Sequence, residues 1–406
     1  MKKFTFLPII VVVLALYLPV LSQTPERTFL SLDVDVPFPP SPVICEGKTH
    51  FLYELHITNF GPSDVTIQGV EVFGKGNPDK SLGTFEGKSL EELITHPGTI
   101  PNPKNHKDKK IISGGKRAHV TLWLTLDGDQ IAPAQLIHHL SVQYAKGLVP
   151  VPDEKKQLKE QVLEAGLVEV RPFNPPVLGP PLEGGEWITV PHNVVGRRAV
   201  IAFDGKARAA QRYGIDYMKF GPDGKLVKGD KNKNENWYGF GTKLIAVTDG
   251  VVSYVLDGEP ENVPYVGPKR ETLTRKNFAG NVVILDIGNG IYTVYAHIKK
   301  DSIRVRVGDK VEKGQILAEL GNTGNSGGPH LHFHVVDQNA ILAAEGVPYV
   351  FESFEILRKL EGDDITELYM KLASWKSKDN VEPDKKQMET PLNFYVLRFP
   401  DTVEKQ

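Results

Sequence analysis

The sequence has little cysteine, because Cys45 is the only one in 406 residues. A chain with one cysteine forms no internal disulfide, so its domains fold on their hydrophobic cores alone. We expect Cys45 to be a small buried apolar residue rather than a reactive thiol. The sequence also has no large excess of positive or negative charge, since the formal net charge is −2 and the pI is about 6.7. This balance argues against a nucleic-acid partner, which requires a strongly basic face.

Long apolar runs are also missing, apart from one near the N-terminus. Lys2 and Lys3 precede an apolar segment from Phe4 to Val20, and Ser22 is a small residue that suits signal peptidase. This pattern predicts a secretory signal over residues 1–22 and an exported protein, periplasmic or extracellular at the cell envelope. The alternative is an uncleaved membrane anchor, which is the one contact with a membrane that the sequence suggests.

Alternating apolar and polar residues dominate the segment that follows. Residues 51–58 and 119–126 place apolar side chains at every second position, and 65–73 is a shorter candidate. A period of two predicts half-buried antiparallel strands. We therefore expect an immunoglobulin-like β-sandwich over residues 23–146. Its scattered histidines are expected to be surface or hydrogen-bonded residues without a catalytic role: His50, His56, His119, His138 and His139.

The composition changes between residues 147 and 186, which we interpret as a linker. The charged stretch 153–166 favours a helix, and the proline density of 171–185 excludes a regular helix or central strand. A second β-rich domain is predicted over 187–351, with strands at 242–256, 281–288, 291–298 and 330–337. Asn289-Gly290 predicts a tight hairpin between two of them. The remainder, 352–406, is expected to be an extension with a helix at 365–377.

Three histidines stand out in the second domain. In a strand, His330, His332 and His334 share one face, and the apolar residues between them share the other. The glycine-rich loop before them lacks the Gly-Lys-Ser/Thr ending of a phosphate loop. His297 ends another predicted strand, and Asp216 follows a glycine turn. Imidazole and carboxylate are ligand types that zinc takes in catalytic sites.

These motifs, in this order, resemble the lysostaphin/LytM-type zinc endopeptidases that cleave peptidoglycan cross-bridges. The resemblance rests on His330-x-His332 after the glycine-rich loop, Tyr295-Ala296-His297, and Gly214-x-Asp216, and it covers roughly residues 187–351. It implies a mainly β protein whose C-terminal LytM-like domain is antiparallel, of the barrel-sandwich hybrid type. The implied partner is peptidoglycan or a related peptide substrate.

The resemblance also implies roles for single residues. Asp216 and His332 match the metal-ligating positions, while His297 and His330 match the two histidines that handle protons and the oxyanion. The implied cofactor is Zn²⁺, which lowers the pKa of bound water and polarises the scissile carbonyl. A nearby histidine would take the proton and return it to the leaving amine.

One position departs from the family's first motif, His-x-Gly-x-Asp. Here Arg212 stands where the first ligand is expected, and a protonated guanidinium has no lone pair to give a metal. In one interpretation His334 replaces the missing ligand, and the protein is a zinc metalloendopeptidase. In the other, Arg212 pairs with Asp216, no zinc binds, and the protein is a non-catalytic wall-binding or hydrolase-activating module. Residues 305–320 also resemble a biotinyl or lipoyl hairpin, but they lack its lysine motif, so only β-hairpin architecture is shared.

Overall fold

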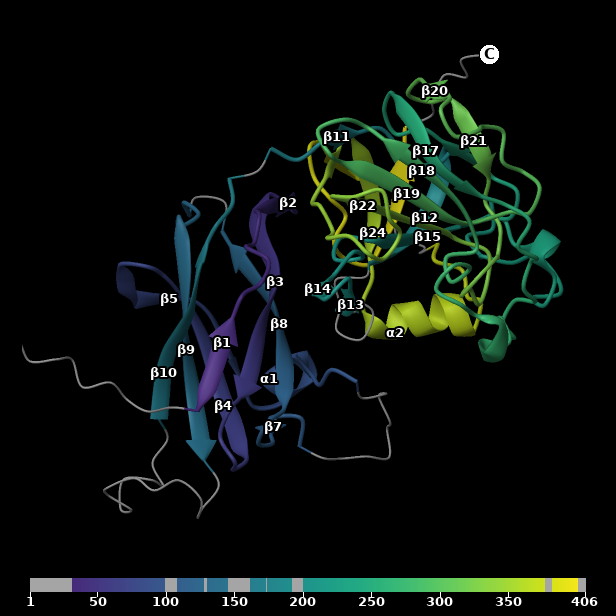
Figure 1. The fold of residues 1–406 in the computed structure, drawn as a ribbon. Coiled ribbons are helices and arrows are strands. Elements are labelled where there is room, and N and C mark those ends of the chain that lie inside the picture. Colours follow the sequence, from purple (N-terminus) through teal and green to yellow (C-terminus); the bar gives the residue numbers. More distant parts are fainter. Residues whose placement is uncertain are drawn as a thin grey trace, which may run out of the picture. The chain divides into compact units, whose positions relative to one another are not determined.

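The strands predicted in the N-terminal half form two sheets of a β-sandwich, as seen in a computed structural model (Figure 1). The structure describes residues 31–98, 108–127, 130–144, 161–172, 174–191, 200–376 and 382–400. The predicted signal, 1–22, lies outside these residues. Leu32–Gln406 form one compact unit. In the described part of the chain, no helix has both the length and the apolar character needed to cross a membrane.

The first sheet of the sandwich is built around a long antiparallel pair. Its strands are ordered β1-β3-β8-β6, with β2 also pairing β3. The inward-facing residues of the pair, such as Phe51, Leu55 and Leu122, are fully buried and form the sandwich core. The predicted strands at 51–58 and 119–126 are therefore confirmed. The bounds are β1 Leu32–Asp35, β2 Val43–Cys45, β3 Lys48–Asn59, β6 Ile94–Thr95 and β8 Arg117–Leu126.

The second sheet closes the sandwich and corrects one prediction. Its strands are ordered β10-β9-β4-β5, with β7 pairing β4, and a short helix α1 (Gly87–Leu93) follows β5. The helix expected at 153–166 is wrong in its described part, because 161–166 belong to strand β10, which pairs with β9. The sandwich thus continues into the predicted linker. The bounds are β4 Val65–Gly74, β5 Asn77–Glu86, β7 Ile111–Ile112, β9 Gln135–Tyr144 and β10 Gln161–Glu169.

The second domain is organised by a long sheet that runs β20-β17-β18-β19-β22-β15-β12-β26-β24-β25 in the described residues. Asn289 and Gly290 both have positive φ and join β18 to β19, as the predicted hairpin requires. The strand expected at 242–256 is instead divided into β16 (Lys243–Ile245) and β17. The other bounds are β12 Gly185–Pro191, β15 Ile215–Lys219, β17 Gly250–Leu256, β18 Asn281–Asp286, β19 Tyr292–Ile298, β20 Lys310–Val311 and β22 Leu331–Val336.

The C-terminal extension is part of this sheet. Strand β26 (Tyr395–Phe399) pairs with β12 and with β24 (Phe354–Lys359), and β24 pairs with β25 (Asp384–Lys386). The helix expected at 365–377 is shorter and begins earlier, as α2 (Gly362–Ile365) followed by the π-helical η3 (Thr366–Met370). The shorter elements are β11 Val177–Leu178, β13 Ile201–Phe203, β14 Lys206–Arg208, β21 Ile316–Glu319, β23 Val350–Phe351, η1 Asn234–Asn236 and η2 Arg270–Thr272.

Candidate functional site

Strand β22 lies between β15 and β19, and this pairing assembles the predicted site. Asp216 on β15 is the direct cross-strand partner of His332, and on the other side His332 faces Ala296, next to His297. Residues opposite each other in an antiparallel pair have side chains on the same face. The sheet register therefore brings together Asp216 and His332, which lie 116 positions apart in the sequence.

His332 is bonded at both ring nitrogens. Its Nδ1 lies 2.7 Å from Oδ1 of Asp216, and its Nε2 lies 2.9 Å from Nδ1 of His334. His334 reaches the Ile341 carbonyl with Nε2 at 3.1 Å. A carbonyl oxygen only accepts, so Nε2 of His334 donates to it. The result is a buried chain of hydrogen bonds that runs from Asp216 to Ile341.

His297 and His330 lie beside this chain, with ring centroids 4.6 Å apart. His297 donates from Nδ1 to the Thr323 carbonyl at 2.7 Å, and burial holds its pKa well below the usual range, with the neighbouring rings adding to the effect. Its φ of 60° is unusual for a residue other than glycine, and such strain is concentrated at functional sites. His330 is the most exposed histidine of the site, and its Nδ1 donates to the Gly328 carbonyl at 2.8 Å.

Arg212 has a different partner from the one the sequence led us to expect. The sequence interpretation that pairs Arg212 with Asp216 is wrong, because the guanidinium donates to both carboxylate oxygens of Glu54 at 2.7 Å. It also donates to Glu345 from Nε at 2.8 Å and from NH2 at 2.6 Å. Asp216 is bonded to His332 instead, and lies 3.7 Å from Nε2 of His330.

These donor directions do not fit a zinc ion held by Asp216, His332 and His334. The two nitrogens of one imidazole point to different places, and Asp216 lies at Nδ1 of His332 while His334 lies at Nε2. One metal cannot meet all three groups, because a catalytic zinc needs three protein ligands around one point. Within the described residues, no group of three or more His, Cys, Asp or Glu side chains is arranged to hold a metal ion.

The sequence did not identify Glu54 and Glu345 as members of this region. Glu54 lies on the sandwich strand β3, 158 residues from Arg212. The sequence indicates only that Glu54 lies on the outer face of a strand with alternating side chains, between Leu52 and His56. That pattern predicts a solvent-facing residue, so nothing in it pointed to Arg212.

Comparison with known proteins identifies the family of this region. Residues 238–343 match the family described as Peptidase family M23. The matched segment includes His297, His330, His332 and His334, but neither Arg212 nor Asp216.

Two curated relatives are each similar to part of this chain. The peptidoglycan DD-endopeptidase ShyA of Vibrio cholerae is 43% identical over 96 residues, which are 23% of this chain and 21% of that protein. The DD-carboxypeptidase/endopeptidase Mpg of Neisseria meningitidis is 39% identical over 59 residues, 14% of this chain and 13% of that protein. The chain therefore matches about a fifth or less of the length of these relatives.

Two solved structures are also similar. The catalytic domain of lysostaphin from Staphylococcus simulans has 23% identity and a TM-score of 0.21, covering 36% of this chain and 80% of that one. The catalytic domain of the M23 protein EnpA from Enterococcus faecalis has 19% identity and a TM-score of 0.24, covering 43% of this chain and 93% of that one. Scores this low carry no argument about function.

Proposed function

We propose that this chain, which carries a Peptidase family M23 domain over residues 238–343, is an exported protein that binds peptidoglycan without hydrolysing it through zinc. One observation carries the proposal. Arg212 stands at the position of the first expected ligand, and two carboxylates hold its guanidinium. A guanidinium supplies no lone pair to a metal, so the first expected ligand is missing. The family fold would then serve recognition at the cell envelope.

The relatives support peptidoglycan as the binding partner. ShyA, which is 43% identical over 96 residues, is named a peptidoglycan DD-endopeptidase. The residues that the resemblance assigns to proton transfer, His297 and His330, are present, and His330 is partly exposed. An imidazole at this position can hydrogen-bond a peptide group of a bound stem or bridge.

Zinc-dependent hydrolysis of peptidoglycan is the second candidate. Asp216 Oδ1 and His332 Nδ1 approach to 2.7 Å, as two ligand atoms aimed at a common point would. His297 and His330 remain beside them. This hypothesis needs a third ligand, and the direction of His334 does not supply it.

The test uses the mature full-length protein. The protein is incubated with one equivalent of Zn²⁺ and dialysed, and bound zinc is measured by elemental mass spectrometry. In parallel it is mixed with purified peptidoglycan, and both co-sedimentation and released fragments are measured. We expect co-sedimentation, no stoichiometric zinc and no released fragments.

Each other outcome overturns a stated part of the proposal. About one zinc per chain, with fragments that disappear in His332→Ala, would establish the hydrolase instead. Absence of co-sedimentation in both the wild type and His332→Ala would remove peptidoglycan as the partner. Because His332 is bonded within the domain, the folding of His332→Ala is checked by circular dichroism before either result is used.

A further inference from the structure

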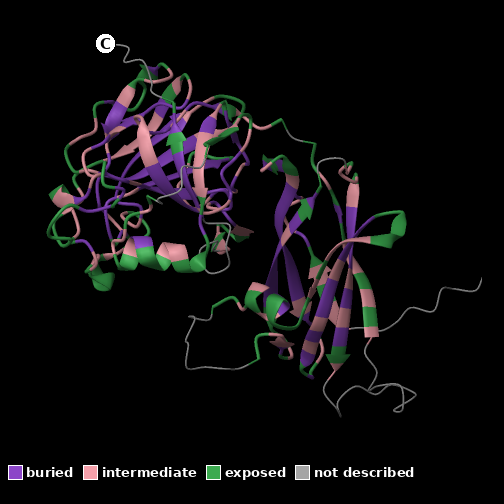
Figure 2. Ribbon diagram, turned by 180° about the vertical axis from the view of Figure 1, so that it is seen from behind, coloured by how far each residue is buried: buried purple, intermediate pink, exposed green. Residues whose placement is uncertain are grey.

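The outer face of the first sandwich sheet is covered, although its pattern predicts exposure. On β3 the core-facing residues alternate with His50, Leu52, Glu54 and His56, and all four of these are buried. Figure 2 shows the buried stretches along these strands. An outer sheet face that packs against nothing is normally polar and solvated. This face therefore packs against another part of the molecule.

The second domain supplies that cover. Val43, Cys45 and Leu52 of the sandwich belong to the same apolar cluster as the core of the second domain, which includes Tyr213 and Tyr395. The Thr390 amide also donates to the Ile44 carbonyl at 2.9 Å. These sandwich residues thus pack into the core of the second domain, while the sandwich keeps a core of its own.

The side chain of Arg212 is buried where the two domains meet. The side chains of Arg212 and Glu54 are 4% and 2% exposed, and that of Glu345 is 14% exposed. NH1 of Arg212 also donates to the Leu52 carbonyl at 3.3 Å. One guanidinium is thus held by a carboxylate from each domain. Charge-assisted pairs of this kind are strong and directional, and removing one partner leaves a buried charge without compensation.

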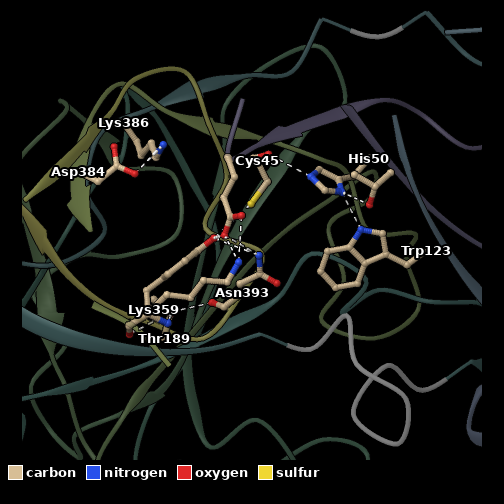
Figure 3. A network of polar contacts seen from close by, with 11 residues as sticks. Cys45, His50, Trp123, Thr189, Lys359, Asp384, Lys386 and Asn393 are labelled. Atoms are coloured by element: carbon tan, nitrogen blue, oxygen red, sulfur yellow. Dashed lines mark hydrogen bonds and ion pairs between the residues drawn. The ribbon is translucent and has the colours of Figure 1, made fainter. Parts of the chain in front are cut away.

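A second polar contact lies near the edge of the same interface (Figure 3). Glu46 accepts hydrogen bonds from Lys359 at 2.8 Å, from Asn393 at 3.0 Å and from Tyr395 at 2.5 Å. Cys45 lies beside it, with Sγ 3.6 Å from the Tyr395 hydroxyl. Cys45 is only 1% exposed, so its thiol can react only when the two domains separate or the chain unfolds.

We propose that the position which the resemblance gives to the first metal ligand anchors a permanent interface, in which Arg212 joins the second domain to the outer face of the sandwich. The sandwich is then an intramolecular partner of the M23 domain, and the two act as one rigid unit. This inference goes beyond the proposed function, because it requires neither peptidoglycan binding nor the absence of hydrolysis.

The single cysteine provides the test. Reaction of Cys45 with a maleimide is followed in the full-length protein under native conditions, where the labelling rate reports the population of opened molecules. We expect Glu54→Gln and Arg212→Met each to label at least about tenfold faster than the wild type. The double variant should label more slowly than the product of the two single effects predicts, since the two residues interact directly.

A matched control separates the interface from general destabilisation. Glu319→Gln removes a carboxylate that also pairs with two cations, Lys299 and Arg304, but lies within the second domain. It should label like the wild type. Domain separation also exposes less surface than global unfolding, so the labelling rate should depend weakly on urea. If Arg212→Met does not fold, Glu54→Gln carries the test alone.

The proposal is overturned if Glu54→Gln labels no faster than Glu319→Gln, or if its labelling has the urea dependence of global unfolding. Additive effects in the double variant would also contradict it. None of these results depends on zinc content or on co-sedimentation with peptidoglycan, so failure of this inference is distinguishable from failure of the proposed function.

Discussion

Strands β22 and β3 have similar patterns of alternating side chains, but their histidine faces lie in different surroundings. Both place histidines on one face of the strand and a mainly apolar set of residues on the other. The polar face of β22 is closed by its own domain, where His332 bonds to Asp216 and His334. The polar face of β3 is closed by the other domain, through Glu54 and Arg212. A period of two therefore tells which residues share a face, but not what covers that face.

The two faces also differ in charge. On β22 one carboxylate is bonded to a row of imidazoles, whereas on β3 a guanidinium is held between two carboxylates. Full charges lose more solvation on burial than rings that can remain neutral. We therefore expect the β3 face to respond more strongly to mutation than the β22 face.

The largest effect is expected from Arg212→Met. The change leaves Glu54 and Glu345 buried without their cation, which should lower the free energy of unfolding by about 3–5 kcal/mol. Urea denaturation followed by tryptophan fluorescence measures this loss. Arg304→Met is the control, because Arg304 is half exposed and its pair with Glu319 contributes about 1 kcal/mol or less. Equal losses of unfolding free energy in the two variants would contradict the prediction that mutation of the β3 face is the more destabilising.

Acid should weaken the β3 face. His56 and His119 are stacked with centroids 4.0 Å apart, and burial lowers the pKa of each to about 4. The charged groups that act on them are Glu54, which favours protonation, and Arg117, Arg212 and His96, which oppose it. Because the unfolded pKa is about 6.5, the unfolded chain binds more protons between about pH 6.5 and 4, and stability falls as the pH falls through this window.

His119→Phe sharpens this prediction. Removing one titrating ring should reduce the acid-induced loss by about 3–4 kcal/mol, since each pKa unit corresponds to about 1.4 kcal/mol. The measurement is thermal unfolding at several pH values, compared between the variant and the wild type. His139→Phe is the control, because His139 is on the partly exposed side of β9. Identical pH profiles for the wild type and His119→Phe would contradict the prediction.

The β22 face should respond less. His334→Leu leaves Nε2 of His332 and the Ile341 carbonyl without this partner, which should cost about 1–3 kcal/mol. Bound zinc should be unchanged, because the three donors do not converge on one point. Chemical denaturation and elemental analysis measure the two quantities. A variant that loses a stoichiometric zinc ion would restore the hypothesis that His334 is a ligand.

Much of the fold follows from the sequence because side-chain alternation and turn chemistry act locally. The strands at 51–58 and 119–126 and the hairpin at Asn289-Gly290 were predicted in this way. Strand β10 was missed because its first residues end the charged segment 153–166, which is rich in the helix-forming residues Glu, Lys, Gln and Leu. Strand β26 was missed because its pairing with β12 joins segments about two hundred residues apart.

Only the part of the site that the sequence motifs cover was predictable. The resemblance brought Asp216 and His332 together, and the sheet register pairs them directly. The partner of Arg212 was not predictable, because Glu54 comes from a different domain and its strand pattern indicates a solvated residue. The direction of His334 depends on which nitrogen of His332 it meets, and sequence spacing carries no information about ring orientation.

The smallest effect is expected at the edge of the interface. Hydrogen bonds from Lys359, Tyr395 and Asn393 outweigh partial burial and lower the pKa of Glu46 to about 2. The side chains of Glu46 and Lys359 are 33% and 59% exposed, so solvent screens their pair. Glu46→Gln should therefore cost only about 0.5–1 kcal/mol in urea denaturation at neutral pH. The wild type should lose the same amount as the pH falls from about 4.5 to 2, because its folded pKa is lowered, whereas Glu46→Gln should not. A loss as large as that of Arg212→Met would place the main anchor at Glu46 and reverse the order argued for the two contacts.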